Sequence, residues 1–163
     1  MVLEDIVKQT GVKSNRSVKI KIEADRLPPQ NFETEEKLLL RPFSFYVKCF
    51  TLPSLFAGRM HALLFRKWKN RVKGRDWYDF EWYIKKGIPL DLNHFLQRAK
   101  DTGDWNESTI SQDQFLKLLN DKFPSVSFDS VREDVRRFIK DDSSLNIWNE
   151  RYFMDLSERL QFQ

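Results

Sequence analysis

Two groups of charged side chains have the types and spacing that phosphate chemistry uses. Glu23 shares one face of a predicted strand with Lys19 and Lys21, so a carboxylate lies between two ammonium groups. Such pairing favours the ionised forms and suits a magnesium-bound phosphate, although cross-strand ion pairs on a solvent-facing strand are the simpler explanation. Asp76 and Asp79 share one helix face. The helix dipole alone also explains carboxylates in a first turn.

A run of basic residues without an acid lies between these two groups. It comprises Arg59, Arg66, Lys67, Lys69, Arg71, Lys73 and Arg75. A solvated face is the plain explanation of such a run, and phosphate or RNA contact is the functional one. The net charge of +4 permits a nucleic acid or nucleotide partner without requiring it. Trp68 and Trp77 have the spacing of core residues, and stacking on bases is the alternative.

Other chemistries find little support in the composition. With two histidines and one cysteine the chain offers no zinc constellation, and it has no glycine-rich phosphate loop of a standard pattern. Cys49 as the lone cysteine fits a reducing compartment. Because we find neither a signal peptide nor a long apolar run, we expect a soluble cytoplasmic protein with no membrane partner.

The elements that must position these groups predict an α+β fold. Residues 18–25 alternate as a strand, and residues 43–50 form a second, more apolar strand, with a polar loop through Glu33, Glu35 and Glu36 between them. Their short connection favours antiparallel pairing. A lone strand pair is marginal, so it is expected to be the edge, or remnant, of a larger sheet. We expect a β region over residues 1–52 and a helical domain over 53–163.

The helical domain has recognisable start and stop signals. Ser54 is expected to cap a first helix, and Gly87 to end a second one that starts near Arg75. Asp91 caps the next helix, and Ser111 with Gln114 forms a capping-box pattern. Two apolar lines predict the last helices, one through Val131, Val135, Phe138 and Ile139, the other through Ile147, Trp148, Phe153, Leu156 and Leu160.

Three stretches of the chain resemble one protein family. They are the strand VKIKIEAD at 18–25 followed by Pro28-Pro29, then LFAGRMHALLFR at 55–66, and KGRDWYDFEWYI at 73–84. In combination they resemble the carboxyl-terminal signature of the AbiEii/AbiGii abortive-infection toxins. The resemblance covers residues 18–100 well, and the remainder is compatible with the helical tail of that family.

The resemblance implies a nucleotidyltransferase of the polymerase-β type, a bacterial toxin of toxin–antitoxin and phage-defence systems. It implies Mg²⁺ and a nucleoside triphosphate as cofactor and substrate, with a target such as tRNA. Glu23 matches the third carboxylate of the family, a metal ligand or activator of the nucleophile, and Asp76 matches its catalytic or base-orienting aspartate. Arg59 replaces the usual lysine. Lys21, Arg66 and Arg75 fall where nucleotide phosphates are bound.

One part of the family pattern is missing from this chain. The family site begins with a Gly-Ser or Gly-Gly turn and an Asp-x-Asp strand, and this sequence contains neither. We therefore expect a truncated or split transferase, inactive or nearly so alone, with an antitoxin, RNA, a second copy or a missing amino-terminal half as partner. The alternatives are a non-catalytic helical module that binds nucleic acid or an antitoxin, and a decayed remnant.

Overall fold

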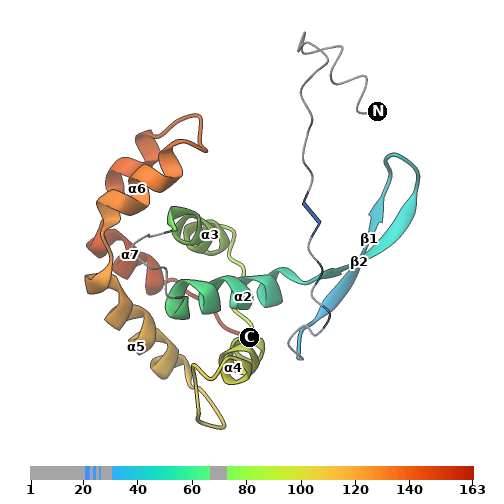
Figure 1. The fold of residues 1–163 in the computed structure, drawn as a ribbon, viewed down its shortest axis with the longest axis horizontal. Coiled ribbons are helices and arrows are strands. Elements are labelled where there is room, and N and C mark those ends of the chain that lie inside the picture. The colour runs from blue at the N-terminus through green and yellow to red at the C-terminus, as the bar shows by residue number, and fades with distance from the viewer. Residues whose placement is uncertain (1–20, 23, 25, 27–30, 67–72) are drawn as a thin grey trace. The chain divides into compact units, whose positions relative to one another are not determined.

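The computed structural model describes residues 21, 22, 24, 26, 31–66 and 73–163, and two compact units divide the chain. One unit comprises Met1–Pro28 with Glu36–Cys49, and the other Pro29–Glu35 with Phe50–Gln163. The order is a strand pair followed by helices, so the α+β class is confirmed (Figure 1). None of the described helices combines the length and apolar character that a membrane crossing requires.

The sheet is a two-stranded antiparallel hairpin of β1, Thr34–Leu39, and β2, Phe45–Phe50. The predicted second strand is thus confirmed, but its partner is β1, and the described residues of the stretch 18–25 do not pair with it. Residues 18–20, 23 and 25 of that predicted strand lie outside the described residues. Lys21, Ile22 and Ala24, the described residues of that stretch, lie in no strand, and Ile22 is 89% exposed. The partner is the stretch interpreted as a polar loop. A turn of a few residues closes this hairpin at little entropic cost, whereas the earlier stretch requires a longer loop.

The helical unit contains six α-helices and two short 3-10 segments in the described part of the chain. They are α2 (Leu52–Phe65), α3 (Gly74–Lys85), α4 (Leu92–Asp101), α5 (Gln112–Lys122), η1 (Phe123–Ser125), α6 (Phe128–Arg136), η2 (Ser143–Ile147) and α7 (Glu150–Ser157). Helices α3 and α4 both pack against α2, and α6 packs against α3 (Figure 1).

Local capping chemistry sets most of the helix boundaries. The Asp91 carboxylate accepts from the His94 amide at 2.9 Å, and Ser111 with Gln114 forms the predicted capping box. Gly87 follows α3 with a φ of +64°, a left-handed conformation that glycine adopts without strain. These three predictions are confirmed. Ser54 is not a cap: it lies in the first turn of α2, behind Thr51, and its buried hydroxyl donates to Asp91 at 2.9 Å.

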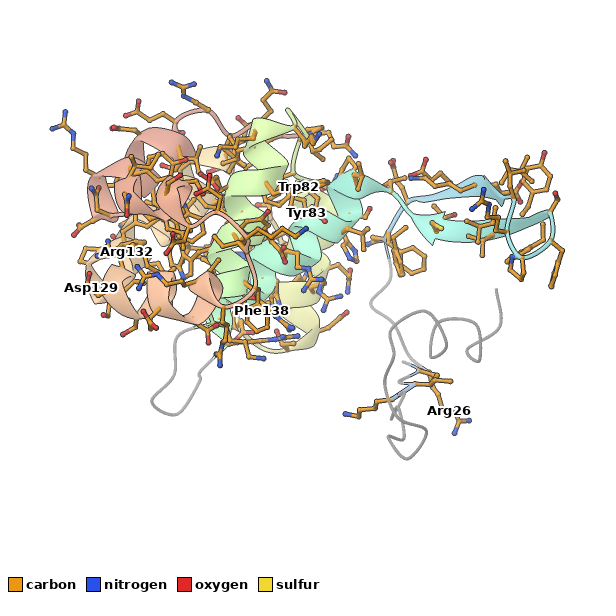
Figure 2. All side chains as sticks on the ribbon, turned by 90° about the horizontal axis from the view of Figure 1, so that it is seen from above. Arg26, Trp82, Tyr83, Asp129, Arg132 and Phe138 are labelled. Carbon is orange, nitrogen blue, oxygen red and sulfur yellow. The ribbon has the colours of Figure 1, made fainter. Side chains whose placement is uncertain are left out.

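The last two predicted helices are shorter than their apolar patterns indicate. Helix α6 ends at Arg136, and Phe138 lies beyond it with 74% of its surface exposed (Figure 2). Ile147 and Trp148 precede α7, which starts at Glu150 behind the cap Asn149. An apolar residue near a helix end continues the periodic pattern whether or not the backbone remains helical, so the pattern overestimates helix length.

The core of the helical unit consists mainly of aromatic rings around α2 and α3. Phe56 of α2 stacks on Tyr83 of α3 with centroids 4.5 Å apart, and Trp77 packs edge-on against Phe153 of α7 at 5.0 Å. Fully buried members of the cluster include Phe80, Phe95, Phe115, Phe123, Phe153 and Trp148. Aromatic pairs in these geometries add to the free energy of burial. The core thus fixes α2 and α3 against each other, and with them the charged residues that each helix carries.

Candidate functional site

Asp76 is the most unusual charged residue of the helical unit. It lies in the first turn of α3 and is only 4% exposed. Its amide donates to the Lys73 carbonyl at 3.1 Å, but its carboxylate oxygen Oδ1 is buried and accepts no hydrogen bond from the described residues. The nearest cation recorded is Arg75 Nε, 3.8 Å from Oδ1. A buried carboxylate oxygen without a donor is costly, so it is a candidate for a role other than stability.

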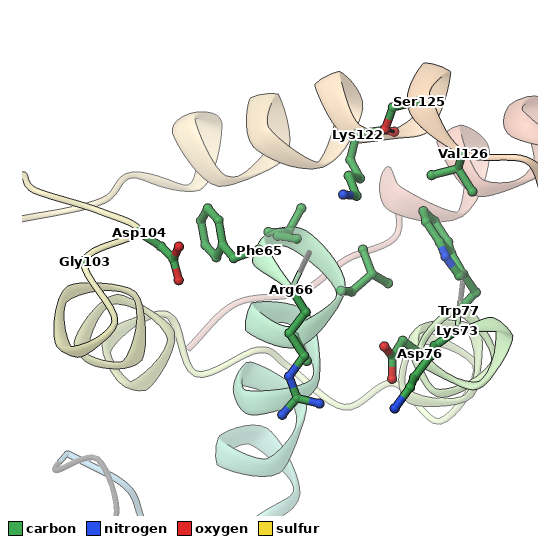
Figure 3. Close-up of a pocket in the computed structure, with 13 residues that line it drawn as sticks. Phe65, Arg66, Lys73, Asp76, Trp77, Gly103, Asp104, Lys122, Ser125 and Val126 are labelled. Atoms are coloured by element: carbon green, nitrogen blue, oxygen red, sulfur yellow. Dashed lines mark hydrogen bonds between the residues drawn. The ribbon is translucent and has the colours of Figure 1, made fainter. Parts of the chain in front are cut away.

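A pocket of about 680 Å³ lies beside this carboxylate. Arg66, at the end of α2, and Lys73, just before α3, line it together with Asp76 (Figure 3). Lys122 of α5 contributes a further cation, and a second carboxylate, Asp104, lies at the pocket with its Oδ2 3.1 Å from His61 Nε2. The rest of the lining consists of Trp77, Val126, apolar residues of α2, Gly103 and Ser125. The pocket thus offers the buried Asp76 carboxylate and three cations beside one histidine-bonded carboxylate, a combination that suits a phosphate-bearing ligand with a hydroxyl partner.

Arg59 and Asp79 connect α2 and α3 next to this pocket. The Arg59 Nε lies 3.3 Å from Asp79 Oδ2, with the Arg59 side chain 46% exposed. Burial raises the pKa of the Asp79 carboxyl, and the Arg59 charge opposes that rise. The Arg59 side chain therefore remains partly accessible to solvent and to a ligand, while the ion pair with Asp79 fixes its position.

Burial also raises the pKa of Asp76, and the charges of Arg75, Arg66, Arg59 and Lys73 oppose that rise in decreasing order. A carboxylate whose pKa is raised accepts a proton more readily than a solvated one. The four cations also show that the residues around Asp76 form one electropositive neighbourhood. Perturbed acids in such settings are typical of functional sites.

Asp76→Asn is expected to stabilise the fold at neutral pH and to have little effect at acid pH. The pKa of Asp76 in the folded state lies above the usual value of 3.8. Ionisation of the buried carboxylate therefore destabilises the native protein only when the pH is above that value. The cost grows as the pH rises through the interval between the two pKa values and is constant above it. Asparagine removes the cost. Thermal unfolding of both proteins at pH 7 and pH 3.5 measures it; equal shifts at both pH values contradict the prediction.

The structure brings together four of the six predicted site residues. They are Asp76 and three arginines of α2 and α3 or their ends: Arg59, Arg66 and Arg75. The charge of each arginine opposes the rise in the pKa of Asp76. Lys21 is exposed and belongs to the other compact unit, and Glu23 lies outside the described residues. The catalytic, phosphate-binding and metal-binding roles assigned to these six residues stay predictions.

Some pocket residues were missed by sequence reasoning. Lys122 was not singled out, because it follows an ordinary amphipathic pattern and reaches the pocket only through the packing of α5.

The two tryptophans that the sequence offered for base stacking have different outcomes. Trp77 is 3% exposed and packs against Phe123, Phe128 and Phe153, so core packing accounts for it. Trp68 lies outside the described residues.

The described residues do not by themselves make a magnesium site. In the ranges 31–66 and 73–163, and at the few described positions before them, no group of three or more histidine, cysteine, aspartate or glutamate side chains is placed to hold a metal ion. Asp76 is nearly buried, and Asp79 is paired with Arg59. Mg²⁺ in proteins needs oxygen ligands in near-octahedral geometry, which these two carboxylates alone do not supply.

Comparison with known proteins identifies the family of this chain. No curated protein and no solved structure matches the chain. A family model does match, over residues 6–158, and its description is "Nucleotidyl transferase AbiEii toxin, Type IV TA system". The matched range includes the whole of α2 and α3 with Arg59, Arg66 and Asp76. Because the match covers nearly the whole chain, the protein belongs to the AbiEii nucleotidyl transferase toxin family of type IV toxin–antitoxin systems.

Proposed function

We propose that this chain supplies the Arg59–Asp76 side of a nucleotidyltransferase centre that moves a nucleotide from a nucleoside triphosphate to an RNA such as tRNA. The observation that carries the proposal is the buried Asp76 oxygen without a donor, beside a pocket lined by Arg66 and Lys73. The toxin role of the family is shared by this chain, and its toxin–antitoxin setting implies an antitoxin partner.

In this proposal Asp76 handles the proton and the arginines handle the phosphates. A hydroxyl of the acceptor attacks the α-phosphorus, and the new P–O bond forms as the bond to pyrophosphate breaks. The hydroxyl proton passes to the Asp76 carboxylate, whose raised pKa makes it a stronger base than a solvated aspartate. Arg66 and Arg59 stabilise the charge that builds up on the departing pyrophosphate, since guanidinium groups bind phosphate oxygens in pairs.

The proposal includes a second contributor to the centre. The family site needs leading carboxylates on an Asp-x-Asp strand after a Gly-Ser or Gly-Gly turn, and these residues are missing from the sequence. The described residues form no metal site of their own, so no step is assigned to a metal on this chain. We propose that another polypeptide segment brings those carboxylates to the Arg59–Asp76 side.

A transfer assay in two arms tests this function. The chain is incubated with tRNA, Mg²⁺ and each α-labelled triphosphate, first alone and then with a family polypeptide that carries both missing motifs. We expect no labelled tRNA in the first arm and labelled tRNA in the second. Because the base is removed, Asp76→Asn is expected to reduce the second signal by about a hundredfold or more.

The matched control is Asp121→Asn, which removes one exposed carboxylate from α5. It is expected to leave transfer unchanged. Transfer in the second arm that does not depend on Asp76, or strong transfer by the chain alone, contradicts the proposal. RNA binding that Asp76→Asn leaves unchanged or tightens, with no transfer in either arm, supports the binding-module alternative instead.

A further inference from the structure

The pocket beside Asp76 has a second end, on the other side of α2. Asp104, which follows α4, lines this α4 end together with Gly103 and with Phe65 of α2. Figure 3 shows Asp104 and Asp76 on opposite sides of the end of α2. Because α3 and α4 both pack against α2, the pocket extends from one of these helices to the other. Its two ends differ in chemistry: Asp76 lies among cations, whereas the α4 end combines a carboxylate with an aromatic ring.

The backbone at the end of α4 holds Asp104 in place. Gly103 has a φ of +75°, and its amide donates to the Lys100 carbonyl at 3.0 Å. The Asp104 amide donates to the Ala99 carbonyl at 2.8 Å. These two hydrogen bonds form a Schellman motif, which closes the last turn of a helix. The Asp104 side chain therefore starts from a fixed backbone position at the pocket.

Two side chains hold one oxygen of the Asp104 carboxylate. His61 Nε2 lies 3.1 Å from Oδ2, and the Thr102 hydroxyl donates to the same atom. Burial lowers the pKa of His61, so its ring is neutral at pH 7, and Nε2 carries the proton because a carboxylate only accepts. The other oxygen, Oδ1, accepts no hydrogen bond from the described residues, and the side chain is 32% exposed. Asp104 thus offers one charged acceptor to a ligand.

Phe65 gives the α4 end a flat apolar wall. Its ring stacks on Phe95 with centroids 6.0 Å apart and lies 5.3 Å from the ring of His61. Phe65 is half-buried and lines the pocket, so part of the ring remains accessible to a ligand. Aromatic side chains provide platforms on which nucleobases stack. A ring of this kind near a carboxylate acceptor suits a planar base that carries an amino group.

We propose that the α4 end of the pocket holds the base of the nucleoside triphosphate, and that Asp104 Oδ1 accepts a hydrogen bond from an amino group of that base. The inference rests on the proposed function, which places the phosphates beside Arg66 and Asp76. The reverse orientation would bring the phosphates against the Asp104 carboxylate, which repels them. A pocket of about 680 Å³ is large enough for a ligand of this size.

The proposed contact makes the site selective among bases. Cytosine carries an amino donor at N4, which carboxylates accept, whereas uracil has a carbonyl oxygen at the same position. An oxygen there would face the Asp104 carboxylate without a proton between them. Asp104 therefore favours cytosine over uracil.

Titration calorimetry with CTP and UTP tests the assignment, because the two nucleotides share the same sugar and phosphates. We expect the wild-type chain to bind CTP about tenfold more tightly than UTP, the size expected for one hydrogen bond to a charged group. In Asp104→Asn the side chain keeps an oxygen for His61 and Thr102, so its amide group faces the ligand as a donor. This variant is expected to bind CTP more weakly and UTP more tightly, and so to lose the preference.

Asp155→Asn is the charge-matched control, because Asp155 is an exposed carboxylate on α7. It is expected to keep the wild-type preference. Phe65→Leu retains an apolar side chain but loses the flat ring, so it is expected to weaken the binding of CTP and UTP by similar factors. Circular dichroism checks that each variant is folded.

Three results would overturn the proposal: equal wild-type affinities for CTP and UTP, no binding of either nucleotide, or a preference that Asp104→Asn leaves unchanged. None of them contradicts transfer that depends on Asp76. Conversely, a preference for CTP that depends on Asp104, without transfer in either arm of the transfer assay, supports the base site and contradicts the proposed function. The two proposals therefore fail separately.

Discussion

Replacing Gly74 by alanine is expected to lower the free energy of unfolding by about 3 kcal/mol or more, an overpacking effect larger than the small helix-propensity gain. A Cβ at Gly74 would lie 2.4 Å from the Val131 carbonyl oxygen and 2.6 Å from Val135 Cγ2. One of these contacts is backbone, so relief requires α3 and α6 to separate. Urea unfolding followed by circular dichroism measures the loss.

Gly58→Ala is the matched control for this prediction. A Cβ at Gly58 has its nearest neighbours at 3.7 and 3.8 Å, which is ordinary van der Waals contact. Alanine there is expected to be neutral or to stabilise α2 by up to about 1 kcal/mol through helix propensity. If Gly74→Ala is as stable as Gly58→Ala, the close approach of α3 to α6 is wrong.

The contacts of Gly74 give a physical reason for the glycine in the KGRD segment. The Gly74 amide donates to Asp134 Oδ2 of α6 at 3.0 Å, so the start of α3 is held to α6 by a hydrogen bond as well as by contact. Asp76 follows two residues later. A side chain at Gly74 would move the first turn of α3 and, with it, the carboxylate in the pocket.

Local chemistry made part of this fold predictable. The Asp91 cap, the capping box at Ser111 and the stop at Gly87 each depend on a few neighbouring residues, so the sequence contains their whole cause. The partner of β2 was not predictable in the same way. Alternation favoured residues 18–25, whereas β1 is short, polar and mostly exposed, and loop closure decided the pairing.

In the candidate site, too, local sequence predicts some features and tertiary packing decides the others. Arg59 and Asp79 are far enough apart in sequence that only the packing of α2 on α3 brings them to 3.3 Å. Helix-face spacing drew attention to Asp76 and the basic run to Arg59, and the family resemblance gave each of them an expected role. Lys122 comes from α5, and its place in the pocket depends on tertiary packing, which local sequence patterns do not contain.

Glu81→Leu is expected to lower the free energy of unfolding by about 3 kcal/mol, because it leaves buried donors without an acceptor. Glu81 is 5% exposed, and its Oε1 accepts from the Trp148 indole at 3.3 Å and from the Tyr152 hydroxyl, and pairs with Lys85 Nζ at 2.8 Å. Burial, followed by the hydrogen bond to Glu81, raises the pKa of Tyr152. The network ties α3 to α7.

A set of variants separates the hydrogen bonds from simple packing. Glu81→Gln retains an acceptor oxygen, so it is expected to cost about 1 kcal/mol. Tyr152→Phe removes one donor, and in the Glu81→Leu background it should cost less than in the wild-type protein, since its partner is already absent. Strictly additive losses would mean that Glu81 and Tyr152 do not interact. Gly74 at the start of α3 holds this helix to α6, and Glu81 further along holds it to α7. Together these contacts keep Asp76 buried at a fixed position beside the pocket.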